Sequence, residues 1–331
     1  MKPKIMLLML SALFLFSAAT HAAVIKIATL SPDGTTWMKK MRAAAEEIST
    51  QTQDRVKIKF YPGGVMGNEN AILRKMRINQ LQGAAVSSGA LDRYYNDASI
   101  YSMPFLFNSH DEAIYVRNKI DHLIVEGLEK GGLISFGFAE SGFAYILSNS
   151  PIKDVAELRK QKAWIPDSES ARQAATAFKF QPIPLPFSDV LAALQTSLVD
   201  TIASSPIAAI ALQWHSQVKY LTEMPLLYGS GTLVISKKTM DKLKAADRAI
   251  VKNIMSKTFA EIDQQNQKDN IAALDALKTQ GISFIKPDPK QLAEWKNLAQ
   301  QGNVDLVAKG FNSKKMYNLV TQHISEYQKL K

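Results

Sequence analysis

Serine and histidine are the residues of this chain whose side chains are candidates for nucleophilic or acid–base chemistry. Ser87 and Ser88 lie at the end of a segment with the composition of a strand. A serine nucleophile needs an adjacent base, and no sequence motif attaches one here. His215 follows Trp214 in a helix-like segment, which favours a structural role. The five histidines show no spacing typical of a metal site.

Signatures of nucleotide-binding and covalent enzymes are absent from the sequence. It has no Gly-x-Gly-x-x-Gly, no Gly-x-x-x-x-Gly-Lys-Ser/Thr and no nucleophile elbow. The chain has 0 cysteines, which excludes disulfides, thiol nucleophiles and cysteine-based metal sites. We therefore predict no cofactor and no metal. A ligand-binding protein is favoured, and a hydrolase or isomerase is the less favoured alternative.

The N-terminal residues 1–22 have the features of a secretory signal peptide. Lys2 and Lys4 precede an apolar core that is short for a membrane span, and Ala22 ends a small-residue cleavage site. We therefore expect a periplasmic protein. The formal net charge is +10, but basic and acidic residues alternate and no nucleic-acid motif accompanies them. No nucleic-acid partner is predicted.

The elements that must position these residues form two alternating sets. Segment 24–30 is apolar and β-branched, 56–61 alternates like a strand, and 83–87 is predicted as a third strand, with helical spacing between them. This β-α-β-α-β order predicts a mainly parallel sheet covered on both faces. Residues 133–204 contain a second set, which predicts a second sheet with its own core.

A long helical run follows, from Met240 to about Thr279. Its middle, residues 263–270, is polar and is expected to be an exposed crossing between two domains. Gly281 ends the run.

Five segments, in order, resemble one family of extracytoplasmic solute-binding proteins. Residues 182–206, PIPLPFSDVLAALQTSLVDTIASSP, carry most of its strand–helix–strand motif. The other segments are Tyr61-Pro62, Met66-Gly67-Asn68-Glu69, residues 85–91 (AVSSGAL) and Pro104-Phe105-Leu106-Phe107. The family is the DctP-type receptors of tripartite ATP-independent periplasmic (TRAP) transporters.

The resemblance implies an α/β fold with two domains, a long interdomain helix and a central cleft, of the class II-like periplasmic binding protein type. We expect domain I to comprise residues 23–141 plus about 230–265. Domain II would comprise residues 142–229 plus about 266–331, including the C-terminal helices. The implied partners are a small organic solute and the small and large subunits of a TRAP membrane permease. The receptor is expected to be a monomer.

Most members of the family bind a ligand carboxylate with an arginine in a Lys-x-Arg-x-Pro pattern. The corresponding residues here are Lys162-Ala163-Trp164-Ile165-Pro166, so Trp164 stands at the arginine position. A second arginine of the family corresponds to Ala144, after Glu140. Ser204 and Ser205 stand where the family often has an asparagine. The resemblance thus implies an intact receptor without the usual carboxylate contacts.

We therefore expect a cleft that is more apolar and aromatic than usual, suited to an uncharged or ring-containing ligand. Its expected lining residues are Trp37, Ser87, Ser88, Glu140, Ala144, Trp164, Phe187, Ser204, Ser205 and Trp214. Three alternatives stay open. In the first, Trp164 would pack in the core instead. In the second, Arg172 or Arg93 would supply the lost charge for an acidic ligand. In the third, the protein would be a carrier or sensor of a hydrophobic ligand that is not coupled to transport.

Overall fold

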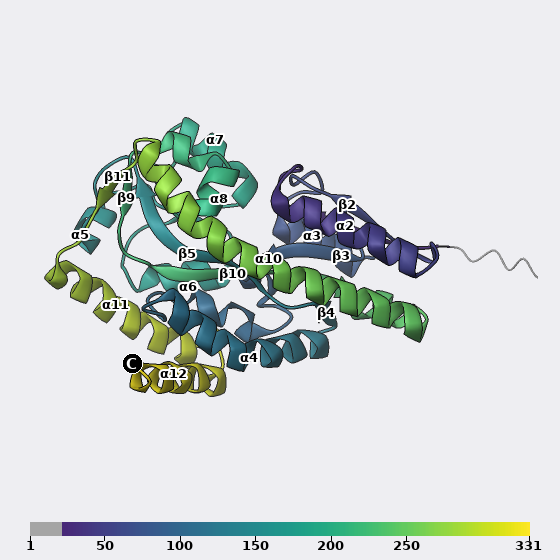
Figure 1. The fold of residues 1–331 in the computed structure, drawn as a ribbon. Coiled ribbons are helices and arrows are strands. Elements are labelled where there is room, and N and C mark those ends of the chain that lie inside the picture. The colour runs from purple at the N-terminus through teal and green to yellow at the C-terminus, as the bar shows by residue number, and fades with distance from the viewer. Residues whose placement is uncertain (1–21) are drawn as a thin grey trace, which may run out of the picture.

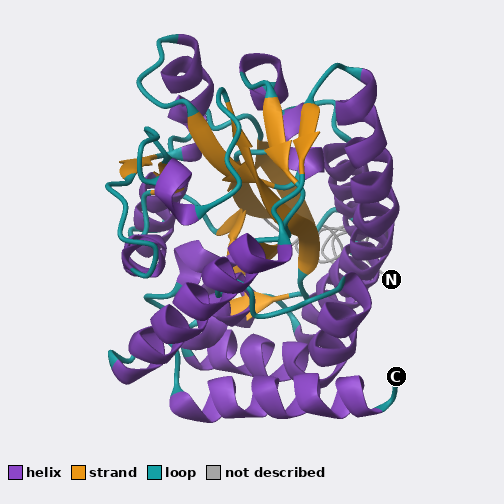
Figure 2. Cartoon of the chain, turned by 90° about the vertical axis from the view of Figure 1, so that its left-hand side faces the viewer, coloured by secondary structure: helices purple, strands orange, loops and turns teal. Residues whose placement is uncertain are grey.

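A computed structural model describes residues 22–331 of the chain. The expected signal peptide lies outside the described residues, apart from Ala22. Figure 1 shows a mixed α/β protein, and Figure 2 shows its strands at the centre with helices around them. None of the described helices is both long enough and apolar enough to cross a lipid bilayer.

The first part of the fold is the expected β-α-β-α-β unit. β1 (Ala23–Thr29) pairs in parallel with β2 (Val56–Tyr61) on one side and with β3 (Gly83–Ser87) on the other. The connections are α2 (Thr36–Gln51) and α3 (Glu69–Arg77), which are capped by the side chains of Thr35 and Asn68. The apolar face of α2 is buried through Met38, Met41, Ala44 and Ile48.

The sheet is mixed rather than mainly parallel. β10 (Leu227–Ser236) runs antiparallel to β3 and to β4 (Leu133–Ser135). In the first part of the fold, the parallel expectation therefore holds for β1, β2 and β3. The difference arises because β10 re-enters the first part from the second, which reverses its direction relative to β3.

Three strands of the second part, β8 (Thr201–Ser204), β9 (Tyr220–Thr222) and β11 (Ser283–Ile285), join the same sheet through β5 (Ala139–Ser148). β5 pairs antiparallel with β8 and β9, and β11 pairs in parallel with β9. β6 (Trp164–Pro166) and β7 (Ile183–Leu185) form a separate parallel pair. The helices of this part are α5 (Val155–Leu158), α6 (Glu169–Thr176), α7 (Val190–Gln195) and α8 (Pro206–Ala211).

β5 and β10 link the two parts. They pair with each other from Ala139↔Gly231 to Leu227↔Ala144, with a register shift between Gly229 and Ser230. Beyond this segment, β5 continues into the second part and β10 into the first. Within the described residues the two expected sheets are thus one continuous nine-stranded sheet.

Helix α10 (Ala245–Thr279) runs along both parts, as Figure 1 shows. It packs on α2 in the first part, on α8 in the second and on β5 between them. Its polar middle is bonded rather than freely exposed. Asp263 accepts a hydrogen bond from the Glu140 backbone N–H at 2.7 Å, and Asn266 donates one to the Glu140 carbonyl oxygen at 2.7 Å. The polar residues hold the crossing strand because its backbone groups need partners there.

Helices α4 (His110–Lys130), α11 (Pro289–Ala308) and α12 (Lys314–Lys329) lie along the lower edge in Figure 1. α9 (Lys237–Asp241) follows β10, α11 packs on α5 and α6, and α12 packs on α4. Short 3-10 helices occur at η2 (Ser88–Leu91), η3 (Asn96–Ser102), η4 (Phe187–Asp189) and η5 (Trp214–Gln217). The C-terminal helix α12 therefore lies on a helix of the first part, whereas the sequence led us to group it with the second.

Candidate ligand-binding cleft

A cavity of about 540 Å³ lies between the two parts of the fold. One side is formed by residues of α3, η2 and η3, and the other by β5, the β6–α6 segment and the end of β8. This volume and location are typical of a site for a small molecule. Within the described residues, no group of three or more His, Asp or Glu side chains is placed to hold a metal ion.

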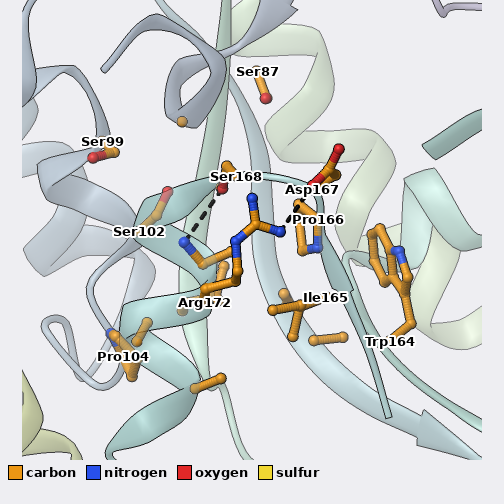
Figure 3. Close-up of a pocket in the computed structure, with 18 of the residues that line it drawn as sticks. Ser87, Ser99, Ser102, Pro104, Trp164, Ile165, Pro166, Asp167, Ser168 and Arg172 are labelled. Atoms are coloured by element: carbon orange, nitrogen blue, oxygen red, sulfur yellow. Dashed lines mark hydrogen bonds and ion pairs between the residues drawn. The ribbon is translucent and has the colours of Figure 1, made fainter. Parts of the chain in front are cut away.

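Arg172 is the cation in the middle of this cavity, as Figure 3 shows. β6 ends at Pro166, and the Ser168 side chain then accepts a hydrogen bond from the Ala171 N–H at 3.3 Å, which begins α6. The first turns of α6 therefore carry Arg172 into the cavity, between Ser102 and Ile165 in the figure.

Two carboxylates orient the Arg172 guanidinium. Nη1 donates to Asp167 Oδ1 at 2.8 Å, and Nε lies 3.4 Å from Glu169 Oε2. The hydrogen bond to Asp167 raises the pKa of Arg172, so the guanidinium stays charged. The main chain of Asp167 is also held from the opposite wall, because the Asn70 side-chain amide of α3 donates to the Asp167 backbone carbonyl oxygen at 3.2 Å.

Glu69 is the acidic side chain at the other wall. Its two carboxylate oxygens accept hydrogen bonds from the Ser87 N–H at 2.5 Å and from the Ser87 hydroxyl at 2.9 Å. Burial raises the pKa of Glu69, and the two bonds from Ser87 act in the opposite direction. The Ser87 hydroxyl is therefore bonded to protein rather than open as a nucleophile.

Seven of the ten expected site residues line the cavity: Ser87, Ser88, Ala144, Trp164, Phe187, Ser204 and Ser205. The three serines among them other than Ser87 are also bonded within the protein. Ser88 donates to the Ser230 carbonyl at 2.9 Å, Ser204 donates to the Ser205 carbonyl at 3.1 Å, and Ser205 caps α8. They shape the wall more than they offer hydrogen-bonding groups.

Trp164 is buried in the core and also contributes to the lining of the cavity. Its side chain is 2% exposed, and the indole N–H donates to the Leu185 carbonyl at 2.9 Å. The ring packs edge-on against Phe187 and Trp214, with centroid separations of 5.1 and 5.3 Å. In Figure 3 it lies to one side of Arg172. The contacts with Leu185, Phe187 and Trp214 therefore bury most of this ring.

Three expected site residues lie outside the cavity lining. Trp37 is partly buried and packs on the cluster beneath α2, because it lies on the sheet-facing side of that helix. Trp214 is 1% exposed in the core of the second part, behind Trp164. Glu140 is 1% exposed and points away from the cleft into a polar cluster next to α4 and α10. The packing of their elements places these three side chains away from the cavity lining.

The cluster around Glu140 joins four elements. The Glu140 carboxylate is bonded to the Tyr228 hydroxyl of β10 and lies 2.8 Å from His110 Nε2 of α4. Arg117, also on α4, pairs with Asp263 of α10 at 2.9 Å. The hydrogen bond to Glu140 raises the pKa of His110. The cluster has a role in holding the crossing strands and contacts no part of the cavity.

Several cavity residues were not predicted from the sequence. Glu69 ends one of the family segments and Asp167 directly follows the strand of Trp164, so their proximity to these motifs was the available signal. Ser99 and Ser102 lie in η3, where no periodic pattern or motif marks them. Arg172 was considered as a possible replacement cation, and the structure places it in the cavity.

Comparisons with known proteins place this chain among bacterial receptors. Residues 27–308 match the family described as bacterial extracellular solute-binding protein, family 7. The sialic acid-binding periplasmic protein SiaP of Vibrio cholerae is 22% identical over 299 residues, 88% of this chain and 91% of that protein. The C4-dicarboxylate-binding periplasmic protein DctP of Rhodobacter capsulatus is 23% identical over 85% of both chains.

A solved structure shares the fold. It is a TRAP periplasmic solute-binding protein from Xanthobacter autotrophicus Py2 with bound β-D-galacturonate, with a TM-score of 0.82 and 18% identity. The match covers 91% of this chain and 99% of that one. The family match, the fold and the cleft between the two parts of the fold all indicate a solute-binding protein. The chain therefore belongs to family 7 of the bacterial extracellular solute-binding proteins, and its fold is that of a TRAP periplasmic solute-binding protein.

Proposed function

We propose that the solute is a small organic acid whose carboxylate binds the guanidinium of Arg172. The observation that carries this proposal is the charged Arg172 side chain in the cavity, oriented by Asp167 at 2.8 Å. Asp167 and Glu169 engage Nη1 and Nε, so the two N–H groups of Nη2 and the second N–H of Nη1 remain for a ligand among the described contacts. A guanidinium held in this way loses little freedom when it binds a carboxylate.

The two positions where the resemblance implied arginines carry no charge, since they are Trp164 and Ala144. A carboxylate that leaves water for such a cavity needs a charge-assisted hydrogen bond, or burial costs several kcal/mol. Arg172 supplies this bond from the helix that follows β6. The relatives support an acidic solute, because one is named for sialic acid, one for C4-dicarboxylates, and a similar structure holds galacturonate.

The wider assignment follows from the family. We propose that residues 1–22 direct export, that the exported receptor is a monomer, and that it delivers its solute to the small and large subunits of a TRAP permease. The proposed domains are the two parts joined by β5, β10 and α10, with the cavity between them.

The test is a binding comparison on the protein from Ala23 to Lys331. Mass spectrometry would first identify the solute that copurifies, and calorimetry would then measure its affinity for Arg172→Gln and for the native protein. A hydrogen bond to a charged group contributes about 1.5–3 kcal/mol, so affinity should fall at least tenfold. Arg74→Gln, an exposed arginine of α3 outside the cavity lining, is the matched control, with a change of at most about threefold. A solute without a carboxyl group, or equal affinity of both variants, would contradict the proposal.

A further inference from the structure

One wall of the cavity next to Arg172 is made of apolar side chains. It consists of Ala144 and Ile146 of β5, Ala163 and Ile165 at β6, and Ala175 and Phe178 at α6, and we call it the inner wall. Each of these residues is at most 9% exposed. They are core residues that still face the cavity, so a ligand group against them is removed from water.

The inner wall offers no side-chain hydrogen-bonding partner. A hydroxyl group placed against it would lose its bonds to water without replacement. A ligand with an apolar group at this wall would instead bind more tightly, by roughly fourfold in affinity for each methylene removed from water. The small side chains of Ala144, Ala163 and Ala175 leave space at this wall that larger residues would fill. The position of Ala144 is where the resemblance implied a second carboxylate-binding arginine.

The charges of the cavity lining accept one carboxylate more readily than two. Among the described lining residues the cations are Arg93 and Arg172, and the acidic residues are Glu69, Asp92, Asp167 and Glu169. Arg93 is exposed, and the inner wall itself carries no charge. A second carboxylate on the ligand would therefore be either desolvated against apolar side chains or close to like charges.

The positions of Arg172 and the inner wall set the distance between the two ends of a ligand. Arg172 and Ala175 are three residues apart on α6, which places them on the same helix face about 4.5 Å apart along its axis. In Figure 3, Ile165 of the inner wall lies beside the Arg172 side chain. An apolar body that starts directly at the carboxyl carbon fits this spacing.

We infer that the solute is a monocarboxylate with an apolar body, an aryl, cycloalkyl or branched alkyl group, rather than a dicarboxylate or a polyhydroxylated acid. The inference rests on the proposed function for its carboxylate end, and on the inner wall for its body. Arg172 binds the carboxylate, and the body lies against Ala144, Ala163 and Ile165.

Four probes that share one six-membered ring test both ends separately by calorimetry. They are cyclohexanecarboxylate, its uncharged carboxamide, the hydroxylated analogue quinate, and cyclohexane-1,4-dicarboxylate. The native protein should bind cyclohexanecarboxylate at least tenfold more tightly than each of the other three. Ala144→Ser, which adds one oxygen to the inner wall, should reduce the preference for cyclohexanecarboxylate over quinate several-fold. Ala43→Ser, at an exposed position of α2 outside the cavity lining, is the matched control and should leave that preference unchanged, and melting temperatures should show that both variants fold.

The outcomes separate the two proposals. If quinate or the dicarboxylate binds as tightly as cyclohexanecarboxylate and still needs Arg172, the apolar-body inference is wrong and the carboxylate proposal stands. If the carboxamide binds as tightly as the carboxylate and Arg172→Gln has no effect, the carboxylate proposal is wrong and the apolar body stands. No binding of cyclohexanecarboxylate at millimolar concentration overturns the inference whatever the other probes do.

Discussion

At the scale of single residues, the place of a residue in a sequence motif does not determine where its side chain lies in the cleft. Trp164 aligns with a carboxylate-binding arginine, yet its indole N–H bonds to Leu185 and its ring packs with Phe187 and Trp214. Arg172, eight residues later, supplies a guanidinium from α6. The loss of one charged side chain is therefore accompanied by another that enters the same cavity from a different element.

His110 provides a prediction about stability and pH. The hydrogen bond to Glu140 raises the pKa of His110 in the folded protein above its value in the unfolded chain. The protonated ring therefore stabilises the fold fully below the unfolded-state pKa of about 6.5, and this contribution is lost as the pH rises through the folded-state pKa. Urea unfolding from pH 5.5 to 8.5 should show a larger decline for the native protein than for His110→Gln.

The neighbours of His110 define the control for that measurement. Asp111, Arg117 and Glu140 are the charged groups around its ring. His122→Gln lies on the same helix without a hydrogen bond to Glu140, so it should keep the decline seen in the native protein. A decline of equal size in His110→Gln would show that other groups cause it.

At the scale of elements, the crossing strands carry two glycines opposite each other. Gly142 of β5 pairs with Gly229 of β10, next to the register shift. Gly142 has φ +84°, and a Cβ there would lie 2.6 Å from Nδ2 of Asn270 on α10. A Cβ at Gly142 would therefore displace the end of the Asn270 side chain, whose amide donates to the Asn266 carbonyl of α10.

Gly142→Ala should destabilise the protein through both backbone strain and crowding. The positive φ costs about 1–2 kcal/mol for alanine, and displacement of Asn270 adds about 1–3 kcal/mol. Gly132→Ala is the matched control, since Gly132 has φ +88° and a Cβ there would have no neighbour within 4 Å. The melting temperature should fall further for Gly142→Ala than for Gly132→Ala, and equal falls would exclude the crowding at α10.

At the scale of the whole molecule, the two parts are held by one polar cluster as well as by the shared sheet. Arg117 of α4 is 4% exposed and contacts Asp263 of α10, the Tyr228 hydroxyl of β10 and the Phe138 carbonyl. Asp263 also accepts from the Glu140 N–H. Helix α10, the crossing strands and α4 therefore meet where the chain passes between the two parts.

Asp263→Ala should destabilise the protein by about 3 kcal/mol, because it removes one carboxylate partner of the buried Arg117 and the acceptor of the Glu140 N–H. Urea unfolding measures this loss. Asp275→Ala, an exposed position on the same helix, is the control and should change stability by less than about 0.5 kcal/mol. A similar small change for both variants would mean that the cluster contributes little.

Much of the fold could be predicted from the sequence because its determinants are local. The apolar strands and the helical spacing act over a few residues, and they predicted the β-α-β-α-β unit and the long helical run. The order of family motifs gave the receptor assignment. Seven of the expected cleft residues line the cavity, and they were chosen from the family motifs that the sequence resembles.

Only the tertiary structure decided which side chains face the cavity. The direction of β10, the burial of Trp164 between β7 and η5, and the entry of Arg172 from α6 depend on contacts between residues distant in sequence. The same holds for Glu140, which packing turns toward His110 and Tyr228. Local sequence sets the periodicity and caps of each element, whereas the rotation of an element about its axis is set by what packs against it.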